Sequence, residues 1–186
     1  MDSDQELPSE SLKTYLKQGN ISLVLDGYED LFSDFDPRPY SKRTLSDDFI
    51  SECKKVVREK KGEISNLELR LLLPKYKRKT SDETIIKRRL KEYFLKQANE
   101  KQKELNQSRR EGGKWILIGF SLSFLSTLLI RQGNPIFNLP LIITEPGGWF
   151  SFWTGLDKLF IEPKGKKPEN EFYKNMSKMT VKFLNY

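Results

Sequence analysis

The chain has 186 residues, enough for one small domain or for one domain joined to a membrane anchor. Its 33 basic and 26 acidic residues give a net charge of +7, which suits nucleic acid, an anionic membrane surface or solubility alone. One cysteine and no histidine exclude an internal disulfide and remove the commonest general base and the commonest zinc ligand.

Apolar residues are concentrated in one part of the chain. The mean hydropathy of −0.63 describes a soluble protein, yet residues 115–161 are mostly apolar or aromatic. Because residues 1–19 are polar and lack an apolar stretch, they predict a mobile tail and no cleaved signal peptide. We therefore expect six parts: a polar tail at 1–19, a cytoplasmic α/β domain at 20–108, a basic juxtamembrane linker at 109–114, a two-segment membrane anchor at 115–161, a basic cytoplasmic linker at 162–178 and a C-terminal strand at 179–186.

In three stretches, apolar residues alternate with other residues in the pattern that is typical of strands. They lie at 21–26, 66–73 and 179–185, and the second is rich in leucine and stops before Pro74. The stretch from Asp30 to Lys42 reads as a loop because it holds two prolines and three aspartates.

Two helices are predicted in the polar part. The first begins near Ser46, where Asp47 and Asp48 suit the positive end of the helix dipole. The second has Thr80 and Glu83 at the spacing of a capping box. Its apolar face ends at Ala98, so any helix through residues 100–110 is expected to be a solvated stalk. These elements predict an α+β fold: a small three-stranded, two-helix, ferredoxin-like cytoplasmic domain with an inserted transmembrane helical hairpin.

The first apolar segment, Trp115 to Ile130, has sixteen residues without a charge. This is close to the roughly 17 residues that a short membrane span needs. The alternative is a buried core helix, but the rest of the chain offers little apolar surface to wrap one.

The second apolar segment, Ile136 to Ile161, is interrupted by Pro140 and by the run from Glu145 to Gly148. It fits either a kinked second span or a re-entrant or interfacial helix with aromatic residues at the headgroup level.

The placement of basic residues predicts the orientation of the anchor. Both flanks are basic and the turn between the segments holds only Arg131, so both termini are expected in the cytoplasm, in a multi-pass protein of the cell membrane. The same flanks are predicted to contact the bilayer and its anionic lipid headgroups: they are Arg109, Arg110, Lys114, Lys164, Lys166 and Lys167. Nucleic acid is disfavoured as a partner, because basic residues are mixed with glutamates in the second helix and no nucleic-acid motif is present.

Two stretches are candidate functional sites. Glu145 lies about nine residues into the second segment, where a carboxylate is costly and usually functional, and Pro146, Gly147, Gly148 and Trp149 follow it. The alternative is that the apolar segment is interrupted at the membrane interface and that Glu145 simply faces water there. In the loop, Asp30, Asp34 and Asp36 offer oxygen ligands for a hard cation. A loop held on the sheet by Phe32, Phe35 and Arg38 is the alternative that we favour.

Two motifs, FSDFDPRPYS in the loop and EPGGWFSFWTGL in the second segment, resemble those of a group of small prokaryotic membrane proteins with two transmembrane segments. The resemblance covers most of residues 21–186. It implies a layout and no activity.

No catalytic constellation, phosphate loop, dinucleotide fingerprint or zinc spacing is visible, so we expect neither an enzyme nor a cofactor. The leading hypothesis is a membrane-anchored interaction or scaffold module with a protein partner or a second copy of itself. The alternative is a small oligomerising membrane effector or transport component with Glu145 in the assembly.

Overall fold

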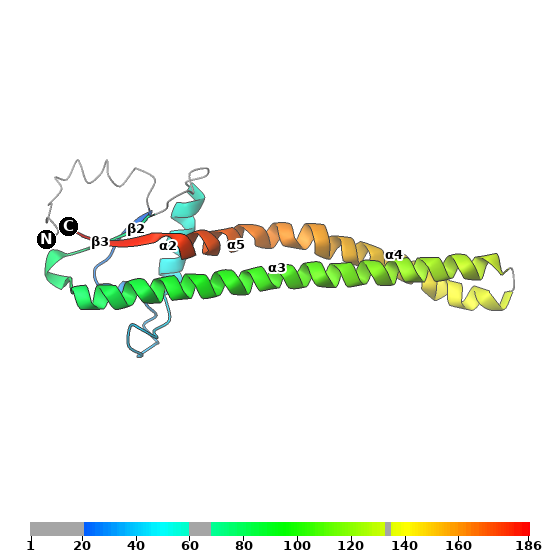
Figure 1. The fold of residues 1–186 in the computed structure, drawn as a ribbon, viewed down its shortest axis with the longest axis horizontal. Helices are drawn as coiled ribbons and strands as arrows, with labels where there is room; N and C mark the ends of the chain where they lie inside the picture. Colours follow the sequence, from blue (N-terminus) through cyan, green and yellow to red (C-terminus); the bar gives the residue numbers. More distant parts are fainter. Residues whose placement is uncertain (1–20, 60–67, 133–134) are drawn as a thin grey trace. The chain divides into compact units, whose positions relative to one another are not determined.

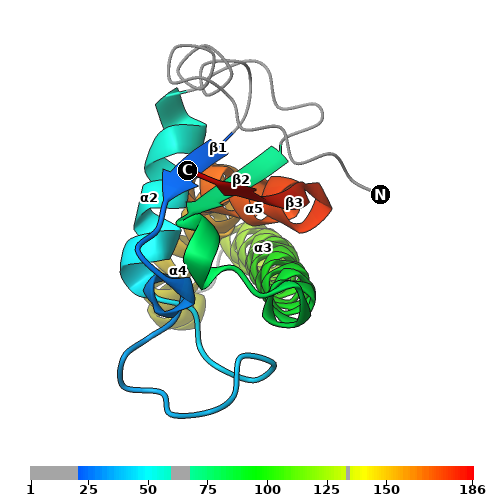
Figure 2. The same ribbon diagram turned by 90° about the vertical axis from the view of Figure 1, so that its left-hand side faces the viewer.

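A computed structural model describes residues 21–59, 68–132 and 135–186. Strands β1 (Ile21–Val24), β2 (Glu68–Leu73) and β3 (Thr180–Asn185) form a parallel sheet in the order β1-β2-β3, and Figure 2 shows the three side by side. Leu69 of β2 lies opposite Ile21 on one side and Val181 on the other. Strands are thus present within all three predicted stretches, although β1 ends two residues before the predicted end at residue 26. Residues 66 and 67 of the second predicted strand and the tail predicted at residues 1–19 lie outside the described residues.

Helices occupy most of the remaining described chain. They are α2 (Asp47–Glu59), α3 (Thr80–Arg131), α4 (Asn138–Leu156) and α5 (Glu162–Lys178). Short helical turns are η1 (Tyr28–Leu31), η2 (Lys75–Lys77), η3 (Pro135–Phe137) and η4 (Asp157–Ile161), of which η4 is π-helical.

The first of two structural units comprises the described residues up to Ala98 together with residues 172–186. One face of its sheet, formed by alternate residues of β2 such as Leu69 and Leu71, is covered by helices. The buried helical residues come from α2, the first turns of α3 and the end of α5: Phe49, Ile50, Cys53, Ile86, Leu90, Phe94, Ala98, Phe172, Tyr173 and Met176. Burial of this apolar surface is the main source of stability for the unit.

The second unit comprises residues 99–171. Here the later part of α3 packs antiparallel against α4, η4 and the start of α5, and Figure 1 shows these segments running side by side. The contacts progress in opposite directions along the two segments: Gln102 with Asn170, Glu111 with Lys158, and Ser126 with Thr144.

The predicted fold class is wrong. A ferredoxin-like sheet has antiparallel neighbours, whereas all three strands here are parallel. A parallel pair needs a crossover that returns the chain to the same end of the sheet. Helix α2 makes the first crossover, and α3, α4 and α5 together make the second.

The anchor is also not a hairpin inserted into a two-helix domain. Its first apolar segment is the continuation of α3, which begins in the sheet unit and runs for 52 residues. The two predicted linkers, 109–114 and 162–178, are both helical. The polar stretch predicted as a solvated stalk has a partner, because Lys101 lies 3.5 Å from Glu169 and the Asn170 amide donates to Gln102.

Candidate functional site

The apolar part of the second unit is buried in an unusual pattern. The residues buried between α3 and α4 are small or hydroxylic: Gly112, Gly119 and Ser126 on α3, and Thr144, Gly148, Ser151 and Gly155 on α4. The large apolar residues of the same helices are exposed, among them Leu117, Phe120, Phe124, Leu128, Ile142, Ile143, Trp149, Phe150 and Trp153. We call the buried set the small-residue seam.

The glycines of the seam allow the two helix backbones to touch. A Cβ placed on Gly119 would lie 2.7 Å from the amide nitrogen of Phe152 and 2.9 Å from the carbonyl oxygen of Gly148. A Cβ on Gly155 would lie 2.8 Å from the carbonyl oxygen of Gly112. Any side chain at these positions would therefore push the helices apart.

Hydroxyl groups satisfy one another inside the seam. The buried Ser126 hydroxyl donates to the Thr144 hydroxyl at 2.8 Å, and Thr144 donates to the carbonyl of Pro140 at 3.0 Å. Buried polar groups with partners cost little, so this contact adds specificity to the pairing.

At one end of the helix pair, contacts between charged residues replace the small-residue seam. Lys158 donates to Glu111 at 2.7 Å, and Lys166 donates to Glu162 at 2.5 Å. Glu162 accepts hydrogen bonds from Lys166 and from the Ser108 hydroxyl, and these two bonds hold the pKa of the Glu162 carboxyl below its usual value.

The basic residues of the two flanks lie at this same charged end of the helix pair. Arg109, Arg110, Lys114, Lys164 and Lys167 are exposed, and Lys167 also lies 3.7 Å from Glu171; Lys166 is less exposed and pairs with Glu162. Five of the six predicted membrane-surface residues thus present accessible side chains.

The stretch from Glu145 to Trp149 lies within α4, which is not interrupted there: Pro146 is inside the helix. The structure separates the predicted site residues, because Gly148 is in the seam while Glu145 and Trp149 are exposed. Trp149 contacts Trp153 edge to face at 5.6 Å between ring centroids. Gly147 is less crowded, with a carbon of Leu122 3.6 Å from where its Cβ would be.

Among the described helices, α3 alone is long and apolar enough to cross a membrane by length and composition. Only 11% of its most apolar 18-residue window is buried. The mostly buried core helix of a soluble protein can pass the same test of length and composition.

The loop of the sheet unit brings Asp36 and Arg38 together and leaves Asp34 apart. Asp36 accepts hydrogen bonds from the Arg38 guanidinium at 2.7 and 2.8 Å and from the Thr44 amide at 2.7 Å. These contacts, Arg38 first, hold the pKa of the Asp36 carboxyl far below its usual range. Its oxygens are thus occupied by the loop itself, and Asp34 is exposed.

The expected attachment of the loop is confirmed for one aromatic residue and wrong for the other. Phe32 is buried in the core and stacks on Tyr40 at 5.2 Å, whereas Phe35 is 98% exposed. The loop is closed by an antiparallel bridge between Phe32 and Leu45.

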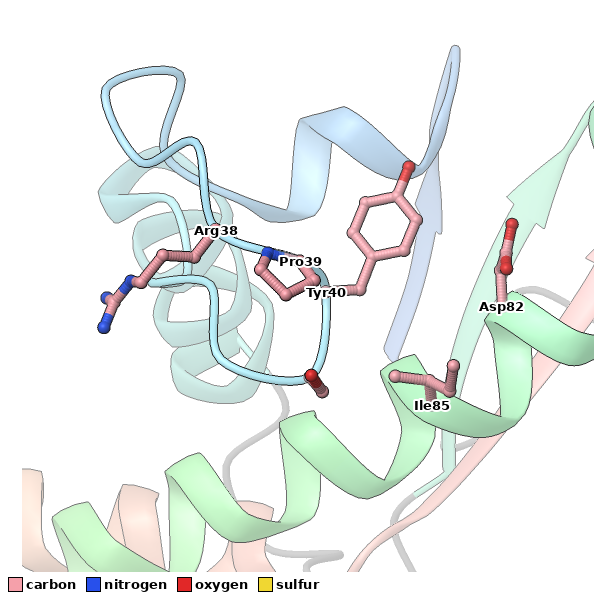
Figure 3. A pocket seen from close by; sticks show the side chains of 6 residues that line it. Arg38, Pro39, Tyr40, Asp82 and Ile85 are labelled. Carbon is pink, nitrogen blue, oxygen red and sulfur yellow. The ribbon is translucent and has the colours of Figure 1, made fainter.

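A hollow of about 360 Å³ lies between this loop and the first turns of α3. In Figure 3 Pro39 and Tyr40 of the loop stand opposite Asp82 and Ile85 of α3, and the Arg38 guanidinium points away from them. The Tyr40 hydroxyl donates to Glu29 at 2.7 Å, and burial with this bond raises the Tyr40 pKa to about 12. The lining is mainly apolar, with the Asp82 carboxylate among its residues.

Glu83, predicted to cap the helix, is instead buried and forms an ion pair with the part-buried Arg78. Glu83 accepts from the Arg78 guanidinium at 2.8 Å and from the Tyr28 hydroxyl at 3.2 Å. Burial is the largest cause of the raised Tyr28 pKa. Arg78 also donates to Asn185 of β3 at 3.2 Å, so this cluster ties the start of α3 to the end of the sheet.

Sequence reasoning missed the small-residue seam, although the chain carried a signal for it. Gly112, Gly119 and Ser126 recur at intervals of seven residues, and so do Gly148 and Gly155. A repeat of seven is the spacing of helices that pack along a shared seam.

Comparisons with protein-family models, with curated proteins and with solved structures find no match to this chain.

Proposed function

We propose that this protein is a membrane-anchored interaction module, in which the apolar parts of α3 and α4 lie in the bilayer and the sheet unit lies in the cytoplasm. The observation that carries the proposal is the inverted burial of the helix pair, with small residues inside and large apolar residues outside. In lipid, helices associate by close backbone packing at small residues because the lipid tails are as apolar as leucine.

In water the same pattern would be unstable. A soluble helix pair buries its large apolar side chains, since the hydrophobic effect drives them together. Here residues such as Phe120, Phe124 and Trp153 are more than half exposed on the helix pair. An exposed apolar surface of this kind marks a membrane or protein contact.

The pairing of the strands supports a return to the same side of the membrane. β2 precedes the apolar helices and β3 follows them, and the two are neighbours in one sheet. A chain that enters the bilayer after β2 must therefore leave it on the side where it entered. Basic residues gather at the charged end of the pair, and such residues tend to stay in the cytoplasm.

The sheet unit supplies the interaction surface. Its hollow beside Tyr40 and its exposed Phe35 are held on a loop that internal ion pairs fix in place. A rigid aromatic residue on a fixed loop is an effective anchor for a protein partner or for a second copy of the chain. In native detergent extracts the full chain should then migrate with a partner or as an oligomer, and a monomer without partners would contradict this role.

Extraction from cell membranes tests the anchor. The full chain should stay with membranes in alkaline carbonate and be released by detergent. Replacing Phe120 and Phe124 with lysine should shift it to the soluble fraction, because each lysine at the centre of a span costs about 3 kcal/mol. Recovery of the wild-type chain in the carbonate-soluble fraction would contradict the proposal.

A second candidate function is favoured by the position of Glu145. Its side chain is exposed on α4, next in sequence to the seam residue Thr144, and Ile142 and Ile143 of the same helix are exposed as well. A carboxylate at such a depth in lipid needs a polar partner. An oligomer with Glu145 facing the assembly would provide one, so Glu145→Gln should change both cross-linked oligomers and ion leakage in vesicles. An unchanged oligomer and no leakage from either form would rule this function out.

A further inference from the structure

A groove runs along the exposed side of α4 and η4. Its volume is about 530 Å³, and it lies where the α-helix changes to the π-helical turn. Residues that line it include Phe150, Trp153, Asp157, Phe160 and Ile161. Local π-helical turns are frequently found at functional sites, because the extra residue redirects the side chains that follow it.

The groove combines aromatic rings with one carboxylate. Phe150, Trp153 and Phe160 are each more than half exposed, so their rings are accessible. Asp157 is exposed and forms no ion pair with any residue in the described part of the chain. The neighbouring basic residue, Lys158, is directed to Glu111 instead, at 2.7 Å. Aromatic faces together with a carboxylate are the chemistry that recognises an ammonium group.

The place of Asp157 along the helix pair indicates the source of that ammonium group. Asp157 is next to Lys158, whose contact with Glu111 marks the end of the seam where the charged contacts begin. In a bilayer this level is the interface, where tryptophan and phospholipid headgroups meet. An acyl chain would fill the apolar part of the groove and leave the carboxylate without a role.

We infer that this groove binds the ammonium group of a zwitterionic phospholipid headgroup, with Asp157 as the counter-charge and Trp153 and Phe160 as ring contacts. The inference rests on the proposed membrane location of α4. It gives the anchor a lipid preference in addition to the attraction of its basic flanks for anionic lipid.

Quenching of a single tryptophan by brominated lipid tests the inference. Full-length chain with Trp115→Phe and Trp149→Phe keeps Trp153 as the reporter in the groove. It is reconstituted in phosphatidylglycerol vesicles with a small, equal fraction of brominated phosphatidylcholine or of brominated phosphatidylglycerol. The ratio of quenching by brominated phosphatidylcholine to quenching by brominated phosphatidylglycerol measures the preference for the zwitterionic headgroup. This ratio should be about two- to fivefold higher in the reporter protein than after Asp157→Asn.

Three further variants separate recognition from general charge effects. Asp157→Glu should keep the preference, and Phe160→Leu should reduce it although the charge is unchanged. Asp48→Asn, which removes an exposed carboxylate of α2 in the sheet unit, should leave it unaltered. An equal ratio in the reporter protein and Asp157→Asn, with strong quenching by both lipids, would overturn the inference and leave the membrane location intact. No quenching by either lipid would overturn both.

Discussion

Asp36 shows how much a single residue can be understood from the sequence. A loop held on the sheet by Phe32, Phe35 and Arg38 was favoured over a cation site, and Arg38 instead forms a two-point ion pair with Asp36 within the loop. The sequence could not show that Phe35 points outward while Phe32 enters the core. That choice depends on the bridge between Phe32 and Leu45, which are distant in the chain.

Replacing Asp36 with asparagine should loosen the loop without unfolding the unit. The Thr44 amide would lose its charged acceptor at 2.7 Å, and the Arg38 guanidinium would lose its partner. Exchange of the Thr44 amide hydrogen should become about tenfold faster. The matched control is Asp34→Asn, an exposed position, where exchange should not change. Equal effects of the two substitutions would show that the ion pair does not order the loop.

The kind of residue that helix α3 buries changes along its length. Up to Ala98 it buries large residues against the sheet, and beyond Gly112 it buries glycine and serine against α4. Between them, polar residues pair with α5, as Lys101 does with Glu169. Both apolar parts of α3 were predicted, but not that one helix joins them. The polar stretch at 100–110 was expected to be solvated because its packing against α5 cannot be read from the sequence.

The first part of α3 should be sensitive to the loss of a buried ring. Phe94 is fully buried and contacts Phe172 and Tyr173, whereas its neighbour Leu95 is half exposed. Phe94→Ala should lower the free energy of unfolding of the sheet unit by about 3–5 kcal/mol. Leu95→Ala should change it by no more than about 0.5 kcal/mol. Denaturant titration of both variants measures this, and similar costs would contradict the burial described here.

The later part of α3 should be sensitive to the gain of a methyl group. Gly119→Ala would place a carbon against the backbone of α4, whereas Gly113→Ala meets nothing within 4 Å. Overpacking of this kind costs about 1–3 kcal/mol. In a Cys53→Ala background, cysteines at Ser126 and Thr144 should form a disulfide readily, more slowly with Gly119→Ala and at the original rate with Gly113→Ala. Equal rates in both glycine variants would show that the helices do not approach as closely as described.

At the scale of the whole molecule, the strands were predicted correctly and their arrangement was not. The apolar alternation of each strand is local, so it can be read from the sequence. Parallel pairing depends on the crossovers, and the second crossover includes α5, whose sequence holds Pro163, Gly165, Pro168 and many lysines. Those residues normally indicate a linker. The helix persists because the end of α5 buries Phe172, Tyr173 and Met176 in the core.

We propose that the apolar helices enter the membrane and return the chain to the cytoplasmic side. This topology is tested by labelling single cysteines in intact cells with a membrane-impermeant maleimide. The background is Cys53→Ala, which removes the one native cysteine, and the exposed positions are Gln132→Cys, Lys164→Cys and Tyr186→Cys. We predict that Gln132→Cys is labelled in intact cells and that the other two are labelled only after permeabilisation. Labelling of all three only after permeabilisation, or labelling of Tyr186→Cys in intact cells, would show that the helices do not cross the membrane and return to the cytoplasm.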